Sequence, residues 1–191
     1  RKIRLVLGEK KVEVELIEER FWERRLQFLN INHAGAVPVF VENEITISDS
    51  MAIFEYLEET HPEPKLLPNL PHQRAEARRL TSWFDDKFHK EVTEKLLYER
   101  VYKKVTKTGY PSSGEIKVGI KNFKAHMDYM NWLLETRKWL AGDQMTIADF
   151  SASAHLSSLD YINDVDWSSY NYVKDWYSKI KSRPAFRPML S

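Results

Sequence analysis

The sequence has no cysteine among its 191 residues, and this absence excludes several kinds of chemistry. Without a thiol the chain has no disulfide, no thiolate nucleophile and no cysteine-bound metal. Its 6 glycines are scattered, so no glycine-rich phosphate loop is present. Its 6 histidines show neither an HExxH motif nor a spacing of four residues, and we therefore expect no metal site.

The sequence also lacks an excess of either charge and any long apolar run. Its 29 Lys and Arg residues against 28 Asp and Glu residues give a formal net charge of +1. Such a balance offers no electrostatic footprint for nucleic acid or anionic lipid. No run approaches the ~20 apolar residues that span a bilayer, and no signal peptide is visible. Because 42% of the residues are hydrophobic, we expect a soluble, cytoplasmic globular protein.

Helical and strand-like patterns alternate in the first third of the chain. The run Val-Glu-Val-Glu-Leu-Ile at 12–17 alternates apolar and acidic residues, as a half-buried strand does. The other patterns predict a helix around 3–7, a short amphipathic helix at 22–30, a hairpin of 37–41 and 45–47, and a helix at 50–59. Because a strand–helix–strand unit needs a parallel first strand, we expect that a strand of the same domain precedes Arg1.

A proline-rich segment separates this region from a helical one. Residues 61–71 hold four of the chain's 8 prolines, a density that predicts a linker. Beyond it, apolar residues recur every three or four positions, with a break at 107–114. We therefore predict an α/β domain at 1–60, a linker at 61–71 and an all-helical domain at 72–191.

One helix start in the second region carries a clear local signal. Thr146 is followed three positions later by Asp149, which forms a capping box with Asp in place of the more usual Glu or Gln. The helix that follows is rich in Ser and Ala, and we expect it to be a buried central helix. We assign this motif a structural role and no chemistry.

These features together resemble the glutathione S-transferase superfamily. The resemblance rests on Val-Pro before the hairpin, Asp-Ser at the start of the next helix, the proline-rich linker and the capping box, and it covers residues 32–39, 47–57, 140–149 and 182–186. It implies an α/β plus all-α architecture: a thioredoxin-like N-terminal domain, whose first strand is absent here, and a C-terminal helical bundle. It also implies a cis peptide bond before Pro38.

The same resemblance makes Val37, Pro38, Asp49 and Ser50 the residues of a glutathione-like pocket. Asp49 can accept from the ammonium of a γ-glutamyl group, while the Ser50 hydroxyl and a helix N-terminus suit its carboxylate. The alternative is that Ser50 only caps its helix and Pro38 only shapes a turn. In this superfamily the Tyr, Ser or Cys that activates the thiol follows the first strand, before Arg1, so the catalytic residue stays unknown.

A narrower resemblance is to a division-associated branch of the superfamily in α-proteobacteria, whose members bind filaments of the tubulin-like GTPase FtsZ. It covers residues 62–68, 74–88, 132–142, 159–167 and 181–190. It implies a factor that alters filament curvature and bundling without transferase activity, and a C-terminal tail beyond Ser191. The main alternative is an active transferase that binds glutathione and conjugates it to small electrophiles. A weaker one is a relative of the maleylacetoacetate isomerases or stringent-starvation proteins.

Three surfaces are candidates for partner binding. Trp22 with Arg24 and Arg25 has the composition of a protein-binding hot spot, although Trp22 would equally fit against its own domain. Lys103, Lys104 and Lys107 form a basic cluster suited to an acidic polymer such as FtsZ, although most charge runs are only solvated. The superfamily fold implies that these two clusters lie on one side of a cleft. The aromatic-rich residues 79–88 predict a homodimer interface.

Overall fold

The structure is a computed structural model that describes residues 1–190. The chain forms two compact units, which divide between Lys65 and Leu66, inside the proline-rich segment. Among the residues described, no helix is both long and apolar enough to cross a membrane.

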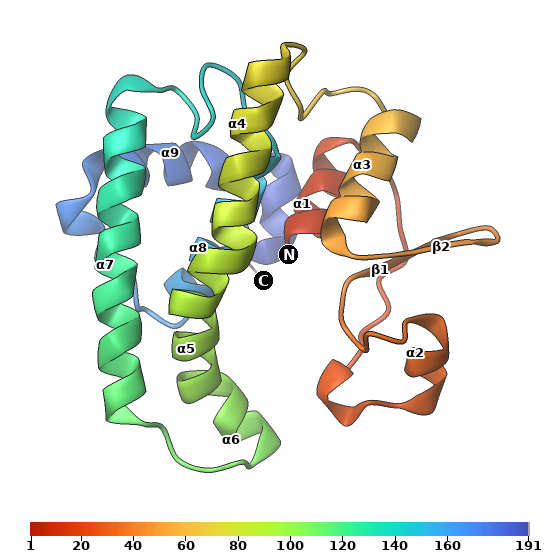
Figure 1. Cartoon of the computed structure of the whole chain (residues 1–191), viewed down its shortest axis with the longest axis horizontal. Coiled ribbons are helices and arrows are strands. Elements are labelled where there is room, and N and C mark those ends of the chain that lie inside the picture. Colours follow the sequence, from red (N-terminus) through yellow and green to blue (C-terminus); the bar gives the residue numbers. More distant parts are fainter. Residues whose placement is uncertain (191) are drawn as a thin grey trace. The chain divides into compact units, whose positions relative to one another are not determined.

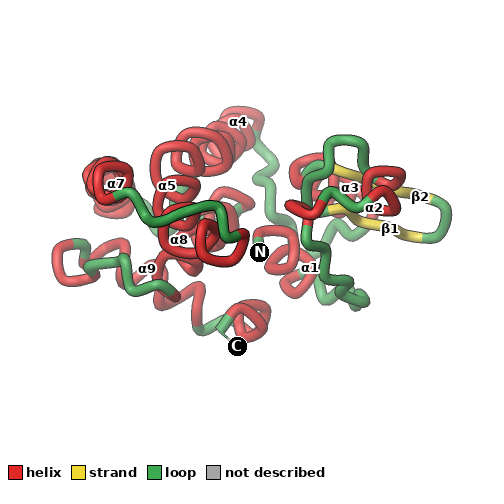
Figure 2. Tube along the Cα trace, turned by 90° about the horizontal axis from the view of Figure 1, so that it is seen from below, coloured by secondary structure: helices red, strands yellow, loops and turns green. Residues whose placement is uncertain are grey.

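The first unit packs helices against a two-stranded hairpin. Figure 2 shows the two strands beside α3. Strands β1 and β2 are antiparallel, with Val39 opposite Ser48 and Glu42 opposite Ile45. The core lies between α1 and α3, where Val6, Phe54 and Leu57 are fully buried. The predicted hairpin and the helices predicted around 3–7 and at 50–59 are confirmed. The elements are α1 Lys2–Glu9, the 3₁₀ helix η1 Phe21–Glu23, α2 Leu26–Ile31, β1 Val39–Glu42, β2 Ile45–Ser48 and α3 Ser50–Thr60.

Two sequence predictions in this unit are wrong. Residues 12–17 form no strand: within residues 1–190 the sheet contains only β1 and β2, and Ile17 is 82% exposed. An alternating pattern selects a face, but a strand also needs a neighbouring backbone to bond with. The single helix expected at 22–30 is two pieces, because Arg24 takes a left-handed conformation with φ of 46° between η1 and α2.

A buried lysine fixes the end of α1 to the segment after α3. The side chain of Lys10 is fully buried, and its Nζ lies 2.6 Å from a carboxylate oxygen of Glu58. The same Nζ donates to the carbonyl oxygens of His61, at 2.7 Å, and Pro64, at 3.0 Å. This ammonium group therefore joins residues that are about 50 positions apart in the sequence.

The second unit is a bundle whose first helical run is almost unbroken. Figure 1 shows that run passing from α4 through α5 to α6 alongside α7. The break predicted at 107–114 is confirmed, whereas the two π-helical stretches, η2 and η3, were not foreseen. The elements are α4 Pro71–Ser82, η2 Trp83–Thr93, α5 Glu94–Leu97, η3 Tyr98–Tyr102, α6 Lys103–Thr106, α7 Ser113–Thr136, α8 Ile147–Tyr161, the 3₁₀ helix η4 Trp167–Ser169, α9 Asn171–Lys181 and the 3₁₀ helix η5 Pro184–Met189.

Helix α8 is the buried centre of this unit, and the capping box at Thr146 and Asp149 is present. Asp149 is fully buried and accepts from the N–H groups of Thr146, at 2.8 Å, and Leu140, at 3.0 Å. It also accepts from the indole N–H of Trp176 on α9, at 2.8 Å. Burial raises the pKa of Asp149 to about 6, although these hydrogen bonds act in the opposite direction. The capping residue therefore also ties a loop and a second helix to α8.

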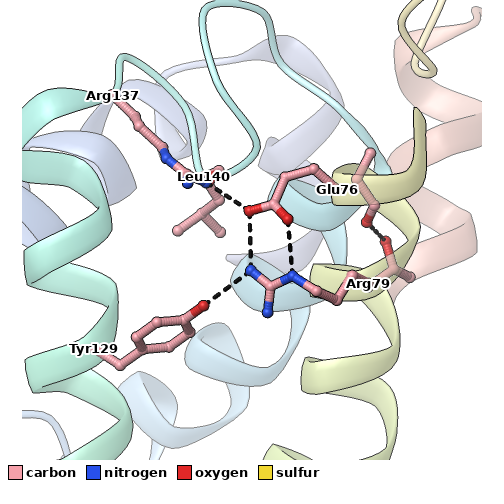
Figure 3. Close-up of polar contacts among 7 residues, drawn as sticks. Glu76, Arg79, Tyr129, Arg137 and Leu140 are labelled. Atoms are coloured by element: carbon pink, nitrogen blue, oxygen red, sulfur yellow. Dashed lines mark hydrogen bonds and ion pairs between the residues drawn. The ribbon is translucent and has the colours of Figure 1, made fainter. Parts of the chain in front are cut away.

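A partly buried carboxylate, that of Glu76, joins α4 to the end of α7 (Figure 3). Glu76 accepts from Nε of Arg79, at 2.8 Å, and from Nη1 of Arg137, at 2.8 Å. Arg79 also donates to the hydroxyl of Tyr129, at 3.0 Å, and Arg137 to the carbonyl oxygen of Leu140, at 2.9 Å. The hydrogen bond from Arg79, with that from Arg137, lowers the pKa of Glu76 to about 2.

Candidate functional site

The hairpin register brings the four predicted pocket residues to one end of the sheet. Val39 is opposite Ser48, so Pro38 and Asp49 are the next residues outward on the two strands. The Val37–Pro38 bond is cis, as the resemblance implied. Val37 is 47% exposed, and its backbone N–H and C=O make no hydrogen bond within the described chain. The end of the hairpin therefore presents free peptide groups beside the start of α3.

The helix start at this end is capped by Asp49. Its Oδ1 accepts from the N–H groups of Met51, at 2.7 Å, and Ala52, at 3.1 Å, and its backbone has φ of 80°. The alternative in which Ser50 is the cap is therefore wrong. Because Asp49 occupies two first-turn donors, the N–H and hydroxyl of Ser50 are the groups left for an anion. The second carboxylate oxygen of Asp49 stays available to a cation.

Asn32 positions the loop before the cis bond, and the sequence analysis did not identify it. It is 7% exposed, and its Nδ2 donates to the carbonyl oxygen of Ala36 at 2.8 Å. Its Oδ1 accepts from the N–H of Ala34 at 3.1 Å, in an Asx-type turn. The signal was an Asn directly after a predicted helix and before Gly35, which has φ of 64°.

The cluster around Trp22 is balanced in charge. Trp22 is 39% exposed and lies edge-to-face with Phe21, with ring centroids 5.3 Å apart. Arg25 forms an ion pair with Glu19, which raises the pKa of Arg25. The guanidinium of Arg24 lies against Gly35 and has no carboxylate partner within residues 1–190. Since residues 18–25 contain three Glu and three Arg, the cluster has no net charge.

One lysine of the basic cluster, Lys103, already forms an ion pair within its own unit. Nζ of Lys103 lies 2.8 Å from a carboxylate oxygen of Glu99 and 5.5 Å from the ring centroid of Tyr98. Lys104 and Lys107 are exposed, and neither has an ion pair in the described part of the chain. Only these two lysines are therefore fully available to a partner. The relative placement of this cluster and the Trp22 cluster stays a prediction.

Buried polar side chains inside the bundle form hydrogen bonds with one another. His126 is 3% exposed and lies between the indole N–H of Trp83, at 3.0 Å, and a carboxylate oxygen of Glu91, at 2.9 Å. Burial lowers the pKa of His126, so Nδ1 is the acceptor for Trp83 and Nε2 carries the proton. His155 bonds through Nδ1 to the hydroxyl of Thr93, at 2.9 Å. No group of three or more His, Asp or Glu side chains among residues 1–190 is placed to hold a metal ion.

Comparisons with known families place both units. The family model for the glutathione S-transferase N-terminal domain matches residues 1–59, and a model for the glutathione S-transferase C-terminal domain matches residues 117–188. Among curated proteins, FtsZ-localized protein A of Caulobacter vibrioides is 44% identical over 100% of this chain and 86% of its own length.

Solved structures give the same picture. A glutathione S-transferase from Rhodospirillum rubrum has a TM-score of 0.97 at 48% identity, over 100% of this chain and 86% of its own. FzlA from C. crescentus has a TM-score of 0.96 at 43% identity, with the same coverage. This chain is therefore almost equally similar to a protein named as a transferase and to one named for its relation to FtsZ.

Proposed function

This chain belongs to the glutathione S-transferase superfamily, and on that premise we propose that it binds FtsZ filaments and regulates their curvature and bundling in bacterial cell division. The observation that carries the proposal is the 44% identity to FtsZ-localized protein A along the entire chain. The likeness extends over both units, at a TM-score of 0.96, and covers 86% of the relative's own chain. The proposed cellular place is the cytoplasm, where FtsZ polymerises.

The two candidate surfaces have different roles in this proposal. Trp22 supplies apolar contact area, with Arg24 and Arg25 beside it, and its charge-balanced surroundings provide no long-range attraction. Lys104 and Lys107 supply the positive field that steers the protein toward an acidic polymer. Lys103, which the sequence analysis grouped with them, supports the cluster through Glu99.

Co-sedimentation with FtsZ polymers tests the proposal. The wild-type protein should pellet with FtsZ in the presence of GTP and stay in the supernatant without polymer. Trp22→Ala should weaken binding by about tenfold or more, the size expected for an interface anchor. Tyr172→Ala, an exposed aromatic on α9, is the matched control and should bind as the wild type does.

The thermal stability of Trp22→Ala is the folding control. An anchor that is 39% exposed should leave the melting temperature almost unchanged when it is removed. A wild-type protein that does not pellet with the polymers would overturn the proposal. A folded Trp22→Ala protein that bundles FtsZ at wild-type concentrations would remove Trp22 from it.

We also propose that the protein is a homodimer joined through the exposed side chains of residues 79–88. Two aromatic residues of this region, Phe84 and Phe88, are fully buried and belong to the core of the unit instead. The face next to this region carries Tyr129 and Trp132, whose rings are stacked with centroids 6.0 Å apart, and Trp132 is 62% exposed. A sedimentation mass near 22.6 kDa at micromolar concentration, the mass of one chain, would contradict the dimer.

An active glutathione transferase is the second candidate function. It is favoured by the end of the hairpin, where the cis bond, Asp49 and Ser50 are together. Under the filament-binding proposal we expect no conjugation of a chloronitrobenzene substrate above the spontaneous rate, because filament binding does not require an activated thiol. Conjugation that is lost in Ser50→Ala but kept in Thr46→Ala, an exposed hydroxyl on β2, would favour the transferase instead.

A further inference from the structure

The most exposed large hydrophobic side chain of the described residues is a tyrosine between two helices of the bundle. Tyr110 is 93% exposed and lies in the connection between α6 and α7, which closes one end of the helical unit in Figure 1. Val105 on α6 is 55% exposed. Lys104 lies on the last turn of α6 and Lys107 at its end; both are exposed, and neither forms an ion pair with another of residues 1–190. We call Lys104, Val105, Lys107 and Tyr110 the helix-end patch.

A buried carboxylate holds this connection in place. Glu99 is 4% exposed and accepts from Nζ of Lys103, at 2.8 Å, and from the N–H of Ser112, at 2.6 Å. Nζ of Lys103 also donates to the carbonyl oxygen of Tyr110, at 3.3 Å. The bonds from Lys103 and Ser112 lower the pKa of Glu99. Because both sides of the connection are tied to α6 and η3, Tyr110 projects from an ordered backbone.

Charge pairing leaves the helix-end patch positive. Glu99 and Lys103 neutralise each other, and Arg100 pairs with Asp164 at 2.8 Å. The cations that remain are Lys104 and Lys107. A partner that covered the patch would bury the ring of Tyr110 and meet these two ammonium groups at its rim. An acidic protein surface has the matching charge, and Tyr is among the residues enriched in protein interfaces.

We propose that the helix-end patch is a docking site for an acidic protein surface, with Tyr110 as its anchor and Glu99 as the positioning residue. The choice of the FtsZ filament as that surface rests on the proposed function. An ordered connection favours binding because little conformational entropy is lost when the ring is covered. A patch with only two free lysines favours a protein over a nucleic acid, whose binding normally uses many phosphate contacts.

Binding by four variants is measured at low and high salt in two assays. One assay is co-sedimentation with FtsZ filaments, and the other is retention on immobilised polyglutamate. Tyr110→Ala should weaken filament binding about tenfold at both salt concentrations. The double variant Lys104→Glu/Lys107→Glu should weaken it mainly at low salt and flatten the salt dependence. The matched controls are Tyr161→Ala, a tyrosine 78% exposed at the end of α8, and Lys174→Glu/Lys179→Glu on α9; both should bind as the wild type does.

Glu99→Gln tests the positioning residue. It leaves every side chain of the patch unchanged but weakens the bonds from Lys103 and Ser112. It should lower filament affinity several-fold and increase hydrogen exchange of the N–H of Ser112. Glu115→Gln is its control, because it breaks the exposed ion pair between Glu115 of α7 and Lys95 of α5. It should change neither the filament affinity nor the hydrogen exchange of Ser112.

The outcomes separate this inference from the proposed function. If the wild type pellets with FtsZ and both patch variants pellet equally well, the helix-end patch is wrong and the proposed function stands. If the wild type does not pellet with FtsZ but its retention on polyglutamate requires Tyr110, the helix-end patch is a docking site and the proposed partner is wrong. Binding to neither probe overturns both. Binding to phosphatidylserine vesicles that requires Tyr110 would assign the patch to a membrane and overturn the protein-docking proposal.

Discussion

Each of the two units contains a fully buried ionisable side chain that joins distant segments, Lys10 in the first and Asp149 in the second, but the surroundings satisfy these two groups in opposite ways. In the first unit, Lys10 has a counter-ion, Glu58, and two carbonyl oxygens. In the second, Asp149 receives only uncharged donors, from Leu140, Thr146 and Trp176. The ion pair offsets its own desolvation through attraction, whereas the lone carboxylate keeps a residual cost, which raises its pKa to about 6.

The surfaces of the two units differ in a related way. Around Trp22, residues 18–25 hold equal numbers of Glu and Arg, so that region has no net charge. At the helix-end patch the acidic residue is buried in a clamp, and two lysines are left outside it. A charge that is paired with an opposite charge therefore stabilises its own unit. A charge that is left unpaired at the surface can attract a partner.

The largest effect is expected from Asp149→Ala. It removes the acceptor for three buried donors on two helices and a loop, each of which then lacks a partner. We expect a loss of about 4 kcal/mol in the free energy of unfolding, measured by chemical denaturation. Asp143→Ala, at an exposed position in the same loop, should change it by less than about 0.5 kcal/mol. Equal effects of the two variants would refute the role given to Asp149.

Lys10→Met should cost somewhat less, about 3 kcal/mol, because Glu58 is 12% exposed and regains some water when its partner is lost. Hydrogen exchange should increase in α1 and α3, the elements that Lys10 joins. The adjacent Lys11→Met, at an exposed position, should leave exchange unchanged. If exchange rises only in the helical bundle, Lys10 does not hold the first unit together.

The pH dependence of stability should reveal the buried carboxyl group of Asp149. The pKa of Asp149 in the folded protein, about 6, is above its ordinary value of 3.8. The folded state therefore holds this proton more tightly, and the contribution of Asp149 to stability falls as the pH rises from about 4 to about 6. Relative to Asp149→Asn, the wild type should lose roughly 2–3 kcal/mol over this range. A constant difference between the two proteins would show that Asp149 is ionised throughout.

The smallest effects are expected from deleting two ion pairs without changing the net charge. Glu99→Gln/Lys103→Gln removes the clamp under Tyr110 and should reduce filament affinity about fivefold, or about 1 kcal/mol. Glu19→Gln/Arg25→Gln removes an exposed pair near Trp22 and should reduce it by twofold or less, because exposed pairs contribute about 0–1 kcal/mol. The reverse order would place the filament contact at Trp22 rather than at the helix end.

The sequence was sufficient for features that depend on neighbours in the chain. Helical spacing, the proline-rich segment and the Thr146–Asp149 box all act within a few residues, and each is present in the structure. The role of Asp49 as a helix cap also had a local signal, an Asp directly before a helical pattern, which the sequence analysis assigned to ligand binding alone.

Features that depend on distant partners were missed or misread. The strand expected at 12–17 needed a neighbouring backbone that its own pattern cannot supply. The contact of Lys10 with His61 crosses 51 positions and leaves no periodic trace. The pairing of Lys103 with Glu99 did have a signal, because Glu and Lys four residues apart on a helix face each other. From that spacing the Glu99–Lys103 ion pair could have been predicted, which leaves Lys104 and Lys107 as the unpaired lysines of the basic cluster.

Electron microscopy of FtsZ filaments tests the central claim most directly. Filaments assembled with GTP are imaged with and without an equal concentration of the wild-type protein, and with the folded Tyr110→Ala protein as a control. We expect curved or bundled filaments with the wild type and filaments close to those of FtsZ alone with Tyr110→Ala. Filaments that the wild-type protein leaves straight and single would contradict the central claim.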